Sequence, residues 1–127
     1  EVDILNGDPG IYSARWGGKR GDFKKAMNRV FKEIYKKDKN WKQKKIKARF
    51  ICALTIYQPN KKLISSVGKI EGSISPTIKG KNGFGYDSIF IPNGYKITFG
   101  QFLKKNKMLM DHRNIAYQKL KRKVTFL

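Results

Sequence analysis

Two apolar runs separated by a short turn most constrain the fold of this chain. Residues 48–57 are nearly all apolar and rich in strand-forming side chains, and residues 63–74 form a second run of this kind. Because Gln58-Pro59-Asn60-Lys61 between them is typical of a turn, the sequence predicts a β-hairpin. Both faces of the first run are apolar, which predicts a central strand covered on two sides. Gly68 and Gly72 indicate bulges or close backbone packing in the second strand.

Helical periodicity follows Asp22, which is a favourable N-cap residue behind Gly21. Apolar side chains recur there at helical spacing, and the basic side chains fall mainly on the opposite face. The apolar stripe consists of Phe23, Ala26, Met27, Val30, Phe31, Ile34 and Tyr35. We therefore predict that these aromatic side chains pack in the core and do not form a ligand platform.

The remaining segments predict shorter elements around the hairpin. A last helix is predicted to begin at Asp111, with Ala116, Leu120 and Val124 along its inner face. The others are a strand end at Val2–Leu5, a loop at 36–47, a loop from Pro76 to Gly83, a strand at Tyr86–Ile91, a turn at Pro92-Asn93-Gly94 and a short helix at Phe99–Lys105. Since strands and helices alternate irregularly, an α/β fold with a mixed sheet is expected.

The length of 127 residues predicts a single domain over residues 1–127. No apolar stretch is long enough to span a bilayer, so no membrane partner is expected. Cys52 is the one cysteine and has no partner for an intramolecular disulfide, which favours a cytoplasmic location. Because the chain begins at Glu1 and shows no leader, it is interpreted as a processed product or a fragment.

The charge of the chain is strongly positive, with 29 basic and 9 acidic residues and a net charge of +20. Such an excess favours anionic partners. Much of it lies between Lys19 and Arg49, where lysine dominates over the arginine that reads phosphates and bases in a bidentate manner. We interpret this region as a solvated face. A basic nucleic-acid-binding module is the alternative, although the aromatic side chains of the helix lie on its buried stripe.

The run Gly83-Phe84-Gly85-Tyr86-Asp87 carries the clearest functional signal. Glycines allow a backbone to approach a ligand closely, and an exposed aromatic between them offers a face for a flat ring. The Asp87 carboxylate is suited either to accept from a ring N–H or to cap the turn. The run therefore predicts a nucleobase-binding loop.

His112 is the only histidine, and it follows the predicted N-cap Asp111. His112 and Arg113 would project as donors from the positive end of a helix, where anions or carbonyl oxygens bind. Lys107, five residues earlier, would serve the same pocket. The sequence contains no zinc-ligand spacing, catalytic triad, Walker loop or dinucleotide fingerprint. If the protein is an enzyme, we therefore expect direct attack by a metal-positioned water.

These motifs resemble those of the inosine/xanthosine triphosphate pyrophosphatase family in type, order and separation. A further matching segment near the start of the chain is Leu5-Asn6-Gly7-Asp8-Pro9-Gly10-Ile11-Tyr12-Ser13-Ala14-Arg15. The resemblance runs from Glu1 to about Gln118. It implies an elongated mixed sheet with flanking helices, two lobes around a nucleotide cleft and a homodimer. The implied reaction is Mg²⁺-dependent hydrolysis of the non-canonical purine nucleoside triphosphates dITP, ITP and XTP to monophosphate and pyrophosphate, which cleanses the nucleotide pool.

The resemblance also implies roles for residues of this chain. Phe84 would stack on the purine, and Gly85 and Tyr86 would shape the pocket. The base edge would face Asp87, His112 and Arg113, and Lys107 would reach the base or nearby phosphates. Donors that pair with the 6-oxo group of hypoxanthine or xanthine are left unpaired against adenine, at a cost of about 1–3 kcal/mol per group. Small-molecule nucleotides, rather than nucleic acid, are therefore the expected partners.

This chain departs from the family pattern at Ser88, where proline is usual, and at Asp111, where serine is usual. Asp111 keeps the capping role and is expected to raise the pKa of His112. The resemblance further implies that the water-activating carboxylate, the phosphate-binding loop and a metal-binding glutamate lie upstream of Glu1. No catalytic or metal-binding residue is therefore assigned within the chain. Little turnover is expected from it alone, and a catalytically dead product is a further alternative.

Overall fold

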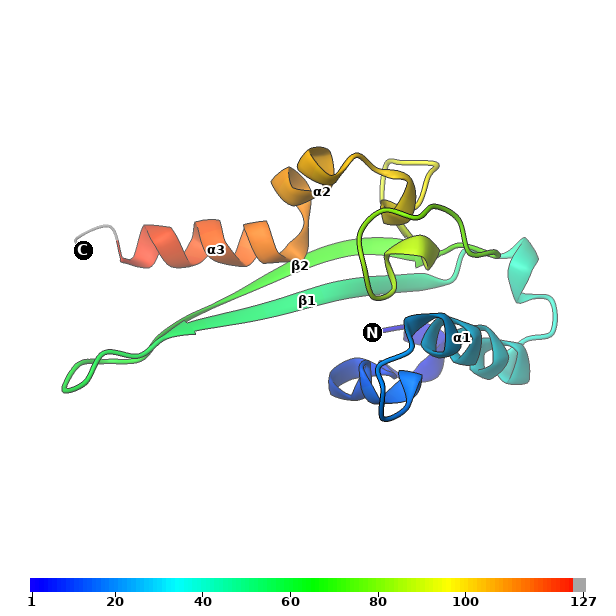
Figure 1. Cartoon of the computed structure of the whole chain (residues 1–127), viewed down its shortest axis with the longest axis horizontal. Helices are drawn as coiled ribbons and strands as arrows, with labels where there is room; N and C mark the ends of the chain where they lie inside the picture. Colours follow the sequence, from blue (N-terminus) through cyan, green and yellow to red (C-terminus); the bar gives the residue numbers. More distant parts are fainter. Residues whose placement is uncertain (125–127) are drawn as a thin grey trace. The chain divides into compact units, whose positions relative to one another are not determined.

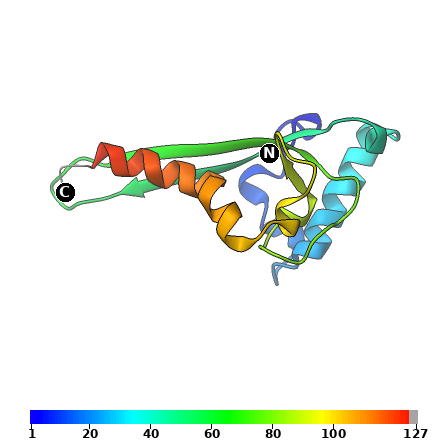
Figure 2. The ribbon, with the colours of Figure 1, turned by 90° about the horizontal axis from the view of Figure 1, so that it is seen from above.

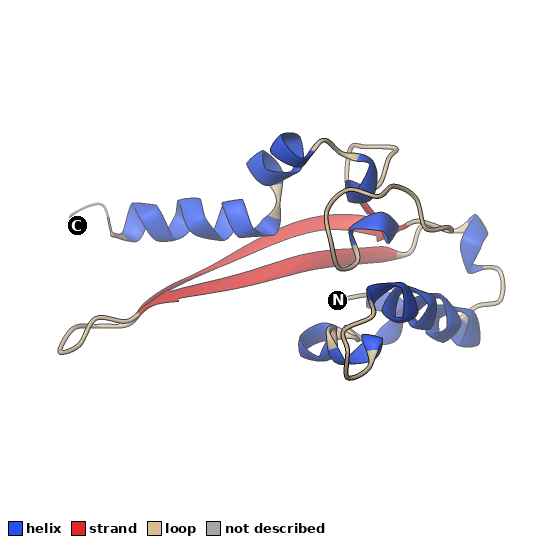
Figure 3. Cartoon of the chain, in the orientation of Figure 1, coloured by secondary structure: helices blue, strands red, loops and turns tan. Residues whose placement is uncertain are grey.

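A computed structural model describes residues 1–124 of the chain (Figures 1 and 3). Its helices are α1 (Phe23–Lys37), α2 (Lys104–Met110) and α3 (His112–Lys123), and its strands are β1 (Lys47–Ile56), β2 (Ile64–Ile74) and β3 (Phe90–Pro92). Short 3-10 turns lie at Asp3–Leu5, Gly10–Tyr12, Arg15–Gly17, Trp41–Gln43, Asp87–Ile89 and Phe99–Gln101. The expected α/β fold class is confirmed, and none of the described helices is long and apolar enough to cross a membrane.

The three strands form one sheet in the order β1-β2-β3. β2 pairs with β3 in antiparallel register, with Gly72 opposite Pro92 and Ile74 opposite Phe90. The predicted hairpin and its turn are confirmed, since Lys61 N donates to Gln58 O. The prediction that the first strand is central and covered on two sides is wrong for residues 1–124. β1 lies at the end of the strand order, and its alternate side chains Ile51, Ala53 and Thr55 are exposed.

Three other segments differ from their predicted elements. Val2 forms only an isolated bridge with Ala48 before the chain enters a 3-10 turn. The strand predicted at Tyr86–Ile91 begins only at Phe90, because backbone N–H groups of residues 87 and 89 close turns on the carbonyls of residues 84 and 86. The helix predicted at Phe99–Lys105 divides into a 3-10 turn and the start of α2.

The chain divides into two compact units, which are described separately. Unit 1 comprises Glu1–Arg49 and Glu71–Lys104, and unit 2 comprises Phe50–Ile70 and the chain from Lys105 onward. A single domain over residues 1–127 stays a prediction.

The core of unit 1 is built on α1. Asp22 caps this helix as predicted, because its side chain accepts from Lys25 N at 3.2 Å. The buried face of α1 confirms the predicted apolar stripe at Ala26, Met27, Val30 and Ile34. The prediction that its aromatic side chains pack in the core is wrong for Tyr35, which is 52% exposed at the end of the stripe, whereas Phe23 and Phe31 are half-buried. Trp41, in the segment predicted as a loop, is also buried and stacks on Phe31 with 5.4 Å between ring centroids. Its burial gives the basic segment after α1 a fixed attachment to the core.

In unit 2, helix α3 runs alongside the hairpin (Figures 1 and 2). Ser66 Oγ donates to Ala116 O at 2.6 Å, and both residues are buried. Gly68 packs directly against the α3 backbone, where a Cβ would overlap His112 O and Ala116 N. The predicted inner residue Leu120 is buried as well. Close packing at Gly68, which its sequence context indicated, is therefore what brings α3 against β2.

Candidate functional site

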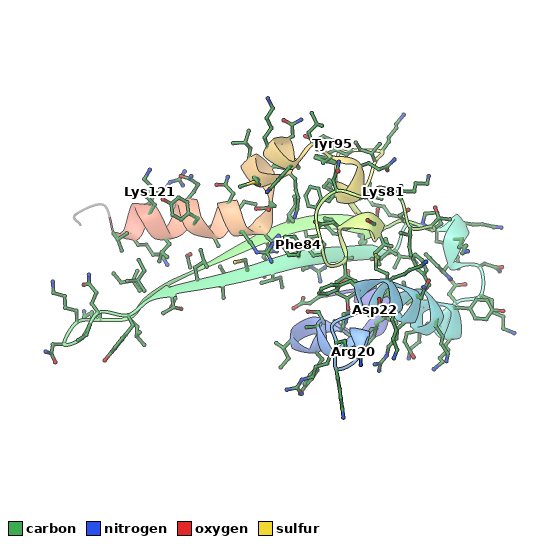
Figure 4. The ribbon with its side chains drawn as sticks, in the orientation of Figure 1. Arg20, Asp22, Lys81, Phe84, Tyr95 and Lys121 are labelled. Carbon is green, nitrogen blue, oxygen red and sulfur yellow. The ribbon has the colours of Figure 1, made fainter. Side chains whose placement is uncertain are left out.

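The glycine-aromatic loop of unit 1 presents one aromatic ring to solvent. Phe84 is 60% exposed, and its position on the loop is labelled in Figure 4. Its flanking residues Gly83 and Gly85 have φ values of +74° and +61°, a region that favours glycine. The turn therefore holds Phe84 outward through backbone geometry that other residues adopt only with strain.

Asp87 holds this loop from inside. Its side chain is buried, and Oδ2 accepts a hydrogen bond from Phe84 N at 3.0 Å. In return, Asp87 N donates to Phe84 O at 3.1 Å. A Cβ on Gly83 would overlap Oδ2, so glycine is required there for space as well as for φ. The turn-capping role that the sequence left open is thus present in the structure.

Tyr86 connects the loop to a distant part of unit 1. Its hydroxyl donates to Ser13 O at 2.5 Å, and its ring meets Phe23 edge-on with 5.8 Å between centroids. Burial raises the pKa of Tyr86 to about 12, against a smaller lowering by the charge of Arg29. The hydroxyl therefore stays protonated at neutral pH and remains a donor. Nothing in the sequence indicated this contact, which joins residues 73 positions apart.

Replacement of Tyr86 by phenylalanine tests this connection. The substitution keeps the ring contact with Phe23 but removes the donor to Ser13 O, so we expect the free energy of unfolding to fall by about 1 kcal/mol. Urea denaturation followed by circular dichroism measures the change. The matched control is Tyr95→Phe, because Tyr95 is half exposed and its ring contact with Phe102 survives the substitution. Equal stability of Tyr86→Phe and the unaltered protein would contradict the assigned role.

The basic candidates of unit 2 gather where α2 ends and α3 begins. Lys107 is buried, and its Nζ lies 3.9 Å from Asp111 Oδ2. Asp111 Oδ1 accepts from Asn114 N at 2.9 Å, which confirms the predicted N-cap. Arg113 is exposed at the first turn of α3. The Asp111 carboxylate thus caps the start of α3 and also lies near the buried ammonium group of Lys107.

His112 is enclosed by the hairpin of unit 2. It is 9% exposed, and its ring lies 5.0 Å from that of Phe50 at an interplanar angle of 41°. Its backbone carbonyl lies against Gly68. Sequence reasoning did not identify Phe50 as a neighbour, since residues 62 positions apart become adjacent only through strand and helix packing. A raised pKa of His112 stays a prediction.

The structure therefore groups the seven candidate residues by unit. Gly85 and the side chains of Phe84, Tyr86 and Asp87 belong to unit 1, whereas Lys107, His112 and Arg113 belong to unit 2. Within residues 1–124, no group of three or more His, Cys, Asp or Glu side chains is arranged to hold a metal ion. Near the start of the chain, Asp3 instead pairs with Arg49 at 2.7 Å.

Residues 1–123 match the Ham1 family. Over 123 residues the chain is 41% identical to the dITP/XTP pyrophosphatase of Clostridium tetani, covering 97% of this chain and 58% of the relative. It is 42% identical over 122 residues to the dITP/XTP pyrophosphatase of Dictyoglomus thermophilum, covering 95% and 57%. Identities of 41% and 42% over nearly the whole of this chain indicate common ancestry with these relatives.

Solved structures agree with the sequence matches. The Ham1 protein of Staphylococcus aureus superposes with a TM-score of 0.88 at 29% identity, covering 99% of this chain and 62% of the other. The Coxiella burnetii HAM1 protein gives 0.87 at 26% identity, covering 99% and 63%. The chain spans 56–60% of the length of the curated relatives that it matches.

Proposed function

Because the chain belongs to the Ham1 family, we propose that it forms part of a nucleoside triphosphate pyrophosphatase. The proposed substrates are dITP, ITP and XTP, which are hydrolysed to the monophosphate and pyrophosphate, cleansing the nucleotide pool. Relatives named dITP/XTP pyrophosphatase support both the reaction and the substrate class.

The observation that carries this proposal is the exposed ring of Phe84 on a loop closed by Asp87. An exposed ring offers a face on which a purine can stack. Because Asp87 and the two flanking glycines fix the backbone, the loop is preorganised for a flat ligand. We propose that Gly85 and Tyr86 shape the surface beside the stacked base.

Recognition of the base edge is assigned to donors and acceptors of the chain. Arg113 and His112 are proposed to donate to the 6-oxo group, and Lys107 to reach the base or a nearby phosphate. The buried Asp87 carboxylate is proposed to face the base edge in addition to capping its turn. A 6-amino group cannot accept these hydrogen bonds, so discrimination against adenine follows from unpaired donors, at about 1–3 kcal/mol each.

Mg²⁺ is the proposed cofactor, and it would stabilise negative charge on the pyrophosphate leaving group. The described residues do not fit this ion, since they contain no suitable cluster of ligands. We therefore assign no metal ligand and no catalytic carboxylate to this chain. Its proposed contribution is to bind and select the base.

A homodimer and a cytoplasmic location complete the proposal. The dimer rests on the family resemblance, and the location rests on the use of a single cysteine, Cys52, which has no disulfide partner.

Pyrophosphate release from dITP, XTP, dGTP and dATP in the presence of Mg²⁺ tests the proposed function. The complete protein that carries this chain should be used. We expect a kcat/KM for dITP and XTP about 10-fold or more above that for dATP, because each mismatched donor costs at least about 1 kcal/mol. Equal rates with all four nucleotides would contradict the proposed selectivity. Release from none of them would favour a catalytically dead product.

A further inference from the structure

Four basic residues of unit 1 form a continuous stripe along α1. Lys25, Arg29, Lys32 and Lys36, hereafter the basic stripe, are all exposed. Their spacing places them within about 60° of one another around the helix and along about 16 Å of its axis. The buried residues Ala26, Val30 and Ile34 occupy the opposite side of α1. Figure 4 shows the side chains along this helix, with Asp22 labelled at its start.

The acidic residues near the stripe are already engaged. Between Arg15 and Arg49 the chain has 15 basic residues but only 3 acidic ones, namely Asp22, Glu33 and Asp38. Asp22 caps α1, and Asp38 pairs with Lys44 at 2.5 Å. Glu33 lies 3.0 Å from Lys36. That hydrogen bond, together with the charges of Lys36, Arg29 and Lys32, lowers the pKa of Glu33. Among residues 1–124, only Lys36 of the stripe thus pairs with a carboxylate.

Arg29 is held in place by an aromatic ring. Its guanidinium carbon lies 4.4 Å from the centroid of the Trp16 ring. A planar cation stacked on an indole loses little further rotamer freedom when it binds a phosphate, and its remaining N–H groups can still donate. The stripe therefore contains one preorganised arginine among three lysines. Because Trp16 lies beneath Arg29, its covered face is not open for a base to stack on.

We propose that the basic stripe binds the phosphate backbone of a nucleic acid strand without reading its bases. Aligned cations on one helix face match a linear array of phosphates and release its condensed counterions. An anionic membrane fits less well. The apolar face of α1 is buried in the core, and the stripe contains no apolar side chain that could insert between lipids. This binding is separate from nucleotide hydrolysis and does not depend on it.

Binding of fluorescein-labelled dT20 to the chain, followed by fluorescence anisotropy at several salt concentrations, tests the proposal. This oligonucleotide contains no purine, so recognition of a 6-oxopurine does not contribute to its binding. We expect a Kd on the order of micromolar at about 50 mM salt. In Lys25→Gln/Arg29→Gln/Lys32→Gln the slope of log K against log salt should become shallower by about 2, because each lost phosphate contact contributes about 0.7. Affinity should fall roughly 100-fold.

The matched control is Lys61→Gln/Lys62→Gln/Lys69→Gln, which removes the same charge from exposed positions of the hairpin. It should retain most of the affinity and the slope. Lys25→Gln/Lys32→Gln, which keeps Arg29 on Trp16, should lose about 1.4 from the slope. Circular dichroism verifies that all three variants fold. Equal losses in the stripe and control variants would overturn the proposal, since bulk charge would then explain binding. Stripe-dependent binding to phosphatidylserine vesicles without binding to dT20 would overturn it as well.

Discussion

Gly68→Ala is expected to lower the free energy of unfolding by about 3 kcal/mol or more. A Cβ at this position would overlap His112 O and the Ala116 backbone, neither of which is a flexible side-chain end that can move aside. Relief requires α3 to shift away from β2, which is costly because Ser66 Oγ bonds to Ala116 O and both residues are buried. Urea denaturation monitored by circular dichroism measures the loss.

Lys69→Ala is the matched control for this substitution. Lys69 is the next residue of β2, and its side chain is exposed on the opposite face of the strand. We expect its stability to lie within about 0.5 kcal/mol of the unaltered protein. If Gly68→Ala were equally stable, α3 would not be held against β2 in the way described. Because His112 and Arg113 begin α3, a shifted helix should also raise the KM of the complete protein for dITP.

Phe84→Ala is expected to raise the KM for dITP by about 5- to 150-fold. The range corresponds to loss of base–aromatic stacking worth about 1–3 kcal/mol. Since Phe84 is 60% exposed, its removal should change stability little. The loop itself should persist, because the hydrogen bond to Asp87 comes from the backbone of residue 84 and not from its ring. Steady-state pyrophosphate release by the complete protein measures the effect.

Two further variants separate stacking from general loss of apolar surface. Phe84→Trp keeps an aromatic face and should retain a KM within a few-fold of the unaltered protein. Leu103→Ala removes an apolar side chain of unit 1 that is 62% exposed, and it should leave the KM unchanged. An unchanged KM in Phe84→Ala would show that the purine does not stack on this ring. It would leave nucleic-acid binding by the basic stripe unaffected, since that proposal rests on side chains of α1 and not on Phe84.

Local sequence patterns were sufficient for the elements that depend on neighbouring residues. The Asp22 cap and the apolar face of α1 follow from helical periodicity, which acts over a few turns. The Asp111 cap of α3 and the hairpin turn at residues 58–61 are local for the same reason. The glycine-aromatic loop was predicted because Gly83 and Gly85 flank an aromatic residue. Glycine is the residue that most readily adopts the positive φ found at both positions.

The same patterns were misleading where a neighbour far along the chain decides the outcome. The run 48–57 is apolar on both faces, yet the face of β1 bearing Ile51, Ala53 and Thr55 is exposed. The exposure results from the position of β1 at the end of the strand order, which the composition of the strand does not determine. By contrast, the segment at residues 87–89 forms a turn instead of a strand for a local reason, because backbone groups three positions apart bond to each other.

The sequence was thus enough to establish the α/β class and the family and to propose seven candidate residues, since these depend on motifs and their spacing. Tertiary structure alone decided which side chains meet. It brought Tyr86 to Ser13, Phe50 to His112 and Gly68 to the start of α3. The physical reason is that side-chain contacts depend on how elements pack in three dimensions, and packing joins residues that no local pattern connects.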